Sequence, residues 1–417
     1  MKKFLGLLLL MGQIKKSHWR EYWTTDALIE TPIFPQTMTR NRFEQILRFF
    51  HIADDTQSMD GANKELWIVK PLMDHFIPKF QSIYAPKQQL SMNEAIVPST
   101  GNLRFRKHNP AKTTRYGVLL RMLSESETGY ILNMEVYAGS GKPSIESITS
   151  VIQPYFGRWH HVYQDNYYNS VAMANMLYEN QTLVCGIIRA NRGIPTVIKD
   201  KSTALQRGEI AYVRNGPIMV LAWKNKRLIN MISTVHDASM KPTRNKKRVF
   251  SSAASKPTCV LDHSKYLAGD DRTGRYLANC HVFRKTGKWY KKMTFFLINC
   301  ALFNAFVLCR SHSEGKSKMR YRQFLLEVAR AWIAADALPA QKVPKTKPQE
   351  TKENHALEKI VTPGKERPTR KCKVCYEEGL RKETRYICKA CNVPLHAYKC
   401  FENFHIALNK SSNKRNK

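Results

Sequence analysis

The densest group of metal-binding residue types lies near the C-terminus. Seven cysteines and histidines follow one another there with the spacing Cys-x₂-Cys-x₁₂-Cys-x₂-Cys-x₄-His-x₃-Cys-x₄-His, namely Cys372, Cys375, Cys388, Cys391, His396, Cys400 and His405. Two Cys-x₂-Cys pairs at this separation are typical of zinc-binding modules, because two thiolates at this spacing can bind the same tetrahedral ion. Four ligands fill one site and leave three for a second, and the spacing does not say which ligands share an ion. We expect the zinc to be structural.

Two runs of basic residues have the composition of nucleic-acid contacts. The first run contains Arg104, Arg106, Lys107, Lys112 and Arg115, and the second contains Arg284, Lys285, Lys288, Lys291 and Lys292 around Trp289 and Tyr290. Lysine and arginine contact phosphates, and aromatic rings supply packing surface. Any one of these residues alone is more often a solvated surface charge. Together they predict contact with double-stranded DNA.

The overall charge supports the same class of partner. The chain has 417 residues, with 68 Lys plus Arg against 33 Asp plus Glu, and a net charge of +35. Such an excess indicates a polyanion, held through phosphate contacts and counterion release. We predict no membrane partner, because we see no basic amphipathic helix and no apolar run near the roughly 20 residues of a membrane span. The basic runs 244–248 and 410–417 predict a nuclear location.

The first twelve residues combine two lysines with an apolar run of leucines. This composition suits a signal peptide, but no small-residue cleavage site follows it. We therefore expect a buried helix at the N-terminus.

Changes in hydrophobic period divide the rest of the chain. Residues 1–88 have apolar positions at helical spacing. Alternating patterns predict strands at 90–97, 116–123, 130–137, 161–164 and 183–188, with a helix at 170–179 between the last two. This order predicts an α/β or α+β core, which we assign to 89–191 and 258–280.

The remaining segments differ in composition. Residues 192–257 are rich in basic and turn residues around short strands, and we interpret them as an insertion and not as a continuation of the core. A second helical segment is expected at 281–338, followed by a Pro- and Lys-rich linker at 339–370. The cysteine-rich module then covers 371–407, and a basic tail covers 408–417.

A series of short motifs is spread along nearly the whole chain, namely Lys3–Leu7, Tyr22-Trp23, Arg42–His51, Leu90–Glu94, Gln164–Ser170, Trp223-Lys224, Ser233–His236, Gly269–Arg272, Arg284–Thr286, Lys288–Tyr290 and the cysteine module. In kind and in order these motifs resemble those of the piggyBac transposase family, and among its members the transposable element-derived proteins.

The resemblance implies a multidomain α+β architecture. An RNase H-like core would carry a β-rich insertion, and a helical dimerization and DNA-binding domain would be built from segments before and after that core. The C-terminal module would be an interleaved two-zinc domain that binds DNA, with His396 in the place of a family cysteine. A homodimer is implied as well. Members of the family cut and join phosphodiesters with two divalent ions, such as Mg²⁺ or Mn²⁺, held by three aspartates.

The three metal-binding positions are carried over residue by residue. The second falls on Asp165, directly after a strand, and the third on Asp271, which we expect to open a helix. The first position holds Asn93, whose neutral amide replaces a carboxylate, and Glu94 should face the opposite side of the strand. Gly274 stands where many family members have a further aspartate. Loss of a bridging carboxylate should lower the rate by roughly 10² to 10⁴.

The sequence therefore predicts a transposase-derived DNA-binding protein with impaired catalysis. Mg²⁺ or Mn²⁺ would be needed only for remaining activity. One alternative is an active cut-and-paste transposase in which water or Glu94 replaces the lost carboxylate. Another is a domesticated scaffold that binds protein partners through the zinc module. Relative to the family, we expect the N-terminus to be short, as in a decayed element copy, an incomplete gene model or a domesticated protein.

Overall fold

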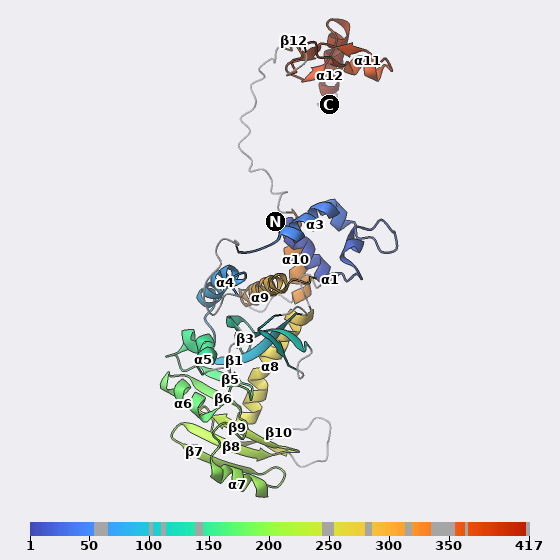
Figure 1. Ribbon diagram of the computed structural model, residues 1–417. Helices are drawn as coiled ribbons and strands as arrows, with labels where there is room; N and C mark the ends of the chain where they lie inside the picture. The colour runs from blue at the N-terminus through green and yellow to red at the C-terminus, as the bar shows by residue number, and fades with distance from the viewer. Residues whose placement is uncertain are drawn as a thin grey trace. The chain divides into compact units, whose positions relative to one another are not determined.

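The computed structural model describes ten stretches of the chain, in two compact units, Met1–Ala337 and Leu338–Lys417 (Figure 1). The described stretches are 1–53, 66–99, 103–109, 114–137, 145–243, 254–279, 286–312, 319–334, 355–362 and 366–413.

A nine-stranded mixed sheet lies at the centre of the described part of the first unit, in the order β2-β3-β1-β5-β6-β9-β8-β7, with β4 paired to β3. The strands are β1 (Gln89–Pro98), β2 (Arg106–His108), β3 (Tyr116–Glu125), β4 (Ile131–Val136), β5 (His161–Gln164), β6 (Leu183–Ile187), β7 (Ile210–Asn215), β8 (Ile218–Lys224) and β9 (Leu228–Ser233). Strands β1, β5 and β6 run parallel, and the other pairs are antiparallel. All five strands expected for the core are confirmed.

The segment 192–257 continues the core sheet. Strand β9 pairs with β6, and β8 and β7 follow it, so the interpretation of this segment as separate from the core is wrong. The physical reason is the apolar face of β8, where Met219 and Leu221 are buried beside Tyr163 of the core. The segment also contains helix α7 (Thr196–Ala204) and the hairpin of β10 (Met240–Thr243) with β11 (Ala254–Pro257).

Three helices pack around the core strands (Figure 1). Helix α5 (Ile145–Ile152) packs against β3 and β4, and helix α6 (Val171–Glu179) packs against β6. Ser170 caps α6 by accepting a hydrogen bond from the Met173 N–H, 3.1 Å. The long helix α8 (Thr258–Asn279) packs against β1, β5, β6 and β9.

The N-terminal and later helical segments pack together. They comprise α1 (Lys2–Gln13), α2 (Ile33–Thr37), α3 (Arg40–Phe49), α4 (Lys70–Ile83), α9 (Trp289–His312) and α10 (Tyr321–Ile333), with a short 3₁₀ helix at Trp19–Trp23. A second 3₁₀ helix, Gln153–Tyr155, follows α5 in the core. Helix α1 is buried, as expected, and packs against α10. Its Gly6 permits close approach, since a Cβ there would lie 2.9 Å from Ile333 Cγ1.

Helix α9 joins the helices to the sheet. By length and composition it could cross a membrane. The prediction that no apolar run approaches the length of a membrane span is therefore wrong. Here it is a core helix, with Phe295, Leu297 and Phe303 buried. Its Asn304 side chain is also buried and exchanges two 2.8 Å hydrogen bonds with the N–H and carbonyl of Ile131, at the start of β4.

The second unit is small and built on short strands. Strand β15 (Tyr386–Cys388) lies between β12 (Leu357–Lys359) and β16 (Val393–Pro394), and β13 (Arg370–Lys371) pairs with β14 (Glu383–Thr384). Helices α11 (Lys373–Glu377) and α12 (Lys399–Asn413) complete it. Two predicted boundaries are wrong here: β12 lies inside the expected linker 339–370, and α12 extends into the expected tail 408–417.

Candidate metal centres and nucleic-acid interface

Four of the predicted zinc ligands form one cluster. They are Cys372, Cys375, His396 and Cys400, whose ligand atoms all lie within 4.8 Å of one another. Cys375 Sγ is 3.5 Å from His396 Nδ1 and 3.7 Å from Cys400 Sγ. Four ligands around zinc, with Zn–S bonds of about 2.3 Å, place two sulfurs about 3.8 Å apart. The cluster therefore has the donor types and the size of a tetrahedral zinc site.

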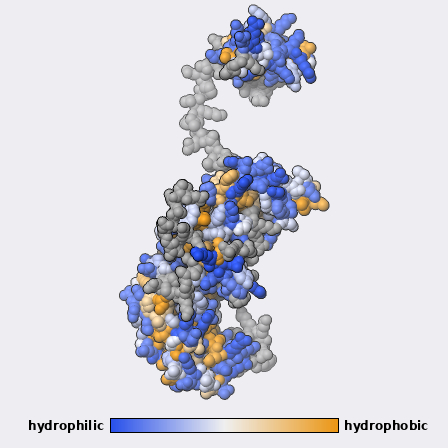
Figure 2. Space-filling view, viewed as in Figure 1, coloured by the Kyte–Doolittle hydropathy of each residue, from blue (hydrophilic) through white to orange (hydrophobic). Residues whose placement is uncertain are grey.

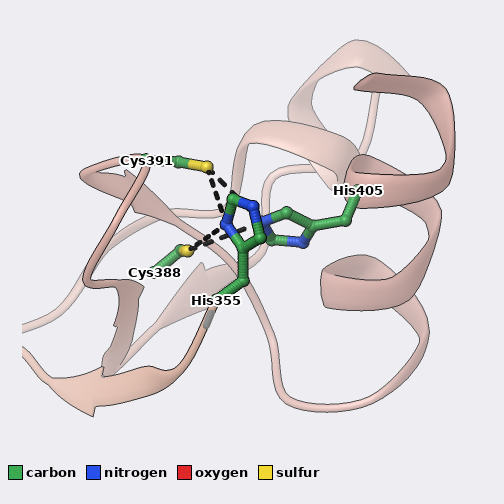
Figure 3. Close-up of side chains that lie close together, drawn as sticks. All are labelled: His355, Cys388, Cys391 and His405. Carbon is green, nitrogen blue, oxygen red and sulfur yellow. Dashed lines mark hydrogen bonds between the residues drawn. The ribbon is translucent and has the colours of Figure 1, made fainter. Parts of the chain in front are cut away.

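The other three predicted ligands form a second cluster, completed by His355 (Figure 3). Cys388 Sγ and Cys391 Sγ lie 3.7 and 3.4 Å from His355 Nδ1, and 3.5 and 3.4 Å from His405 Nε2. The two ligand sets interleave along the chain, as the resemblance implied. His355 was not predicted as a ligand because it lies in the expected linker. The sequence did indicate a missing ligand, since two tetrahedral zinc sites need eight ligands and only seven were identified.

Hydrogen bonds orient two of the ligand histidines. His396 Nε2 donates to the Glu383 carbonyl, 3.0 Å, and His405 Nδ1 donates to the Phe401 carbonyl, 2.6 Å. In each ring the donated proton leaves the other nitrogen, which faces the cysteines, free to bind a metal. This tautomer assignment supports zinc binding at both clusters.

Two of the three predicted catalytic positions lie at neighbouring parallel strands. Met92 of β1 pairs with Gln164, the last residue of β5, so Asn93 within β1 and Asp165 directly after β5 each follow this pair by one residue. Asn93 is half-buried and Asp165 is exposed. The Asp165 carboxylate accepts a hydrogen bond from the Asn166 N–H, 2.6 Å.

Helix α8 covers the face of the sheet on which Asn93 lies. In this face Tyr163 contacts Tyr266 of α8, with ring centroids 4.8 Å apart, and Cys185 Sγ donates to the Cys259 carbonyl, 3.5 Å. Ser91 pairs with Tyr163 in register, and Asn93 follows Ser91 by two residues. Because strand side chains alternate, Asn93 shares the α8 face, and Glu94 lies on the opposite face.

Asp271 lies within α8, so the expectation that it opens a helix is wrong. Helix α8 begins thirteen residues earlier, at Thr258. The Asp271 side chain is outside the described residues, and its convergence with Asn93 and Asp165 stays a prediction. Gly274, one turn further along α8, is exposed.

Glu94 is held by a residue from the loop after β5. Tyr168 is buried, and its hydroxyl donates to Glu94 Oε1, 2.9 Å. Burial, and then the neighbouring Glu94 charge, raise the pKa of Tyr168 well above its usual value. The hydroxyl therefore stays protonated and keeps Glu94 on the face opposite Asn93.

Two residues near Asp165 were missed by sequence reasoning. His263 of α8 is buried and donates through Nε2 to the Gln164 carbonyl, 3.0 Å, and burial lowers the pKa of His263. Arg189 follows β6, is exposed, and donates through Nη2 to Asn166 Oδ1, 3.1 Å. The sequence did contain a signal for Arg189, because it follows a predicted strand as Asp165 does, and the carboxyl ends of parallel strands lie at the same edge of a sheet.

The first basic run surrounds the edge strand β2. Arg104, Arg106, Lys107 and Arg115 are exposed, whereas Lys112 lies outside the described residues. The Arg106 guanidinium lies 5.6 Å from the ring centre of Tyr116, and Lys107 Nζ lies 4.4 Å from that of Tyr137. These cations can approach a phosphate from solvent. In the face shown in Figure 2, hydrophilic residues cover most of the described surface.

The second basic run is only partly at the surface. Lys291 is buried and donates to the carbonyls of Leu47 and Arg48 at the end of α3, so its prediction as a DNA contact is wrong. Burial lowers the pKa of Lys291, and this ammonium caps a helix C-terminus. Lys288 is exposed and Lys292 is half-buried. Arg284 and Lys285 lie outside the described residues.

Family models match two parts of the chain. The model described as Transposase IS4 matches residues 1–306, and the model described as DDE_Tnp_1-like zinc finger matches residues 350–406. The second match includes His355 and all seven predicted ligands.

Curated human relatives are distant but extensive. The chain is 21% identical to PiggyBac transposable element-derived protein 3 of Homo sapiens over 427 residues, covering 97% of this chain and 69% of the relative. It is 23% identical to PiggyBac transposable element-derived protein 2 of Homo sapiens over 331 residues, covering 74% of this chain and 55% of that relative.

A solved structure has the same fold. The cryo-EM structure of the piggyBac transposase synaptic complex with hairpin DNA matches with a TM-score of 0.70 and 22% sequence identity. The match covers 95% of this chain and 85% of that chain. With the Transposase IS4 model matching most of the length, the chain belongs to the piggyBac transposase family.

Proposed function

We propose that this protein is a piggyBac transposase-derived DNA-binding protein with an impaired catalytic metal site. The observation that carries the proposal is the position of Asn93 and Asp165, each of which directly follows one member of the Met92–Gln164 pair of β1 and β5. Asn93 presents a neutral amide from within β1, and Asp165 directly follows the neighbouring parallel strand β5. The nearest alternative carboxylate, Glu94, is hydrogen-bonded to Tyr168 on the other face.

The strand order supports an RNase H-like core. The antiparallel meander β1, β3 and β4 is extended by β5 and β6, which run parallel to β1, so the sheet reads β4-β3-β1-β5-β6. Ends of parallel strands are common places for binding sites in α/β sheets, because loops from several strands converge there. Asp165 and Arg189 follow the ends of β5 and β6, and Asn93 lies in β1, one residue beyond the residue that pairs with the end of β5.

DNA binding is supported by charge and by the fold match. The matched structure is a complex with hairpin DNA, and exposed cations surround β2 and follow β6 here. We propose that Arg104, Arg106, Lys107, Arg115 and Arg189 contact phosphates. The proposal further includes structural zinc at both clusters and a nuclear location, based on the basic runs 244–248 and 410–417.

Salt titration tests the DNA-binding part. Fluorescence anisotropy with a labelled duplex should give a log K that falls linearly with log salt, with a slope of about −0.9 per phosphate contact. Replacing both Arg104 and Arg106 by Gln should reduce the slope by about two. Binding that barely changes between low and moderate salt would contradict phosphate-based recognition.

Calorimetry with Mn²⁺ tests the metal-site part. The Asn93→Asp protein should bind Mn²⁺ more tightly than the native chain, because a charged oxygen ligand is restored. Asn215→Asp, which adds the same charge at the exposed end of β7, serves as the matched control. Equal affinity in native and Asn93→Asp proteins would show that position 93 is not a metal ligand.

An active transposase is the competing function. It requires a replacement for the lost carboxylate, and the Tyr168 hydrogen bond argues against Glu94 in this role. Excision of a DNA segment flanked by cognate ends in Mg²⁺, abolished by Asp165→Ala, would establish that activity and overturn the impaired assignment.

A further inference from the structure

The loop that carries Asp165 is fixed by two buried side chains. This loop, Asp165–Asn169, connects β5 to the cap of α6, and is called the Asp165 loop below. Tyr168 and Asn169 are 3% and 1% exposed, whereas Asp165 is exposed. Loops normally run over the surface with their polar groups in water. Two buried polar side chains in so short a loop therefore need a structural reason.

Tyr168 ties the loop to β1. Its hydroxyl donates to Glu94 Oε1, 2.9 Å, and Glu94 follows Asn93 directly in β1. Arg121 of β3 stands opposite Glu94 in register and is buried, and its guanidinium forms an ion pair with Glu135, 2.9 Å. A hydrogen bond to a charged acceptor is stronger than one between neutral groups.

Asn169 ties the loop to β5 and β6. Its Nδ2 lies 3.3, 3.1 and 2.9 Å from the carbonyl oxygens of Gln164, Asp165 and Ile187. Gly186 provides the room for this side chain, because a Cβ there would lie 2.2 Å from Asn169 Nδ2 and 2.3 Å from the Gln164 carbonyl. Any larger residue at 186 would displace either Asn169 or the strand end.

We infer that Tyr168 and Asn169 are positioning residues for Asp165. Together with Glu94 they form a set of contacts that is called the clamp below, and Glu94 is not a metal ligand. The inference rests on the proposed site at Asn93 and Asp165. A metal ligand must be held within about 0.5 Å of its productive position. The clamp fixes the Asp165 backbone against three strands and leaves the carboxylate itself exposed for an ion.

The test uses the full chain with Asn93→Asp, which should bind Mn²⁺ measurably. Adding Tyr168→Phe removes the hydroxyl that bonds to Glu94 and keeps the ring. Adding Asn169→Ala instead removes the side-chain amide that bonds to the ends of β5 and β6. Each should weaken Mn²⁺ binding about tenfold, at the lower end of the range for residues that support metal ligands. Tyr178→Phe on α6, outside the loop, is the matched control and should leave the affinity unchanged.

Variants of Glu94 separate positioning from ligation. In the Asn93→Asp background, Glu94→Gln keeps an acceptor for Tyr168 and should retain the affinity within about twofold, whereas Glu94→Ala should lose as much as Tyr168→Phe. The double change Tyr168→Phe with Glu94→Ala should be no weaker than either single change, because both remove one interaction. If Glu94→Gln weakens binding as strongly as Glu94→Ala, Glu94 acts through its charge, and the inference is wrong.

A metal-free measurement separates failure of the clamp from failure of the proposed site. If Asn93→Asp brings no gain in Mn²⁺ affinity, the metal site is wrongly assigned. The clamp is then tested without metal, by the rate of amide hydrogen exchange in a peptide that covers 161–170. Tyr168→Phe and Asn169→Ala should speed exchange about tenfold over Tyr178→Phe, the effect of one lost hydrogen bond. Equal exchange in all three would overturn the clamp.

Discussion

At the scale of single residues, chemistry and burial decide different things. Asn93 lacks a carboxylate in any fold, but only its neighbours show that Glu94 is hydrogen-bonded to Tyr168. Lys291 and Lys288 have the same side chain and lie three residues apart, yet one caps α3 from inside and the other is exposed. A basic residue thus becomes a DNA contact only when the fold leaves it at the surface.

His355 provides a residue-scale prediction about zinc. Replacing His355 by Ala should lower the zinc content from about two ions per chain to about one, because three ligands no longer close a structural site. His312→Ala, an exposed histidine at the end of α9, is the control and should keep both ions. Zinc can be counted by mass spectrometry of the dialysed protein. Two ions in the His355→Ala protein would exclude His355 as a ligand.

His160 provides a prediction about pH. Burial lowers the pKa of His160, whose Nδ1 donates to the Gln88 carbonyl, 3.3 Å. As the pH falls, His160 is therefore protonated more readily in the unfolded chain than in the folded chain. The contribution of neutral His160 to the unfolding free energy is present above about pH 6.5 and is lost as the pH falls below it. His160→Asn should lose less unfolding free energy than the native chain between pH 7.5 and 5.5. Urea unfolding at both pH values measures this, and an equal loss in both proteins would contradict it.

At the scale of elements, close packing and free edges shape the molecule. Helix α1 meets α10 at Gly6, so segments from opposite ends of the first unit form one helical layer. At the sheet, β9 pairs with the edge of β6, and β8 and β7 extend the sheet further. Asn304 of α9 forms paired hydrogen bonds with Ile131, which fixes this helix against β4.

Two glycines in helices should respond oppositely to alanine. Gly6→Ala should reduce the unfolding free energy by about 1–3 kcal/mol, because its Cβ would lie 2.9 Å from Ile333 Cγ1 and 3.2 Å from the Ala329 carbonyl. Gly274→Ala in α8 meets nothing within 4 Å and should raise stability by about 0.5–1 kcal/mol. Urea unfolding followed by tryptophan fluorescence compares them. A stabilising Gly6→Ala would show that the α1 and α10 contact is loose.

At the scale of the whole molecule, the folds of the two units are stabilised by different interactions. The first unit has an extensive apolar core, whereas in the described part of the second the buried apolar side chains, besides cysteines, are Ile360, Ile387 and Leu395. So small a core rarely stabilises a domain without metal ions or disulfides. We therefore expect the fold of the second unit to depend on zinc.

Metal removal tests this difference. A strong chelator should unfold the second unit, because metal binding and folding are coupled in such modules, and should leave the first unit intact. All seven tryptophans lie in the first unit, so their fluorescence reports that unit alone. Limited proteolysis should then cut within 366–413 after chelation and not before. Protection that survives complete zinc loss would show that the apolar contacts suffice.

The sequence by itself determined what is local. Alternating residues predicted the strands, Cys-x₂-Cys spacing predicted zinc, and the family motifs marked Asn93 as a missing carboxylate. Only the tertiary structure decided which distant groups meet: His355 with Cys388, Lys291 with α3, and Arg189 with Asn166. The physical reason is that periodicity and ligand spacing are properties of neighbouring residues, whereas strand pairing and side-chain burial depend on contacts between residues far apart in the chain.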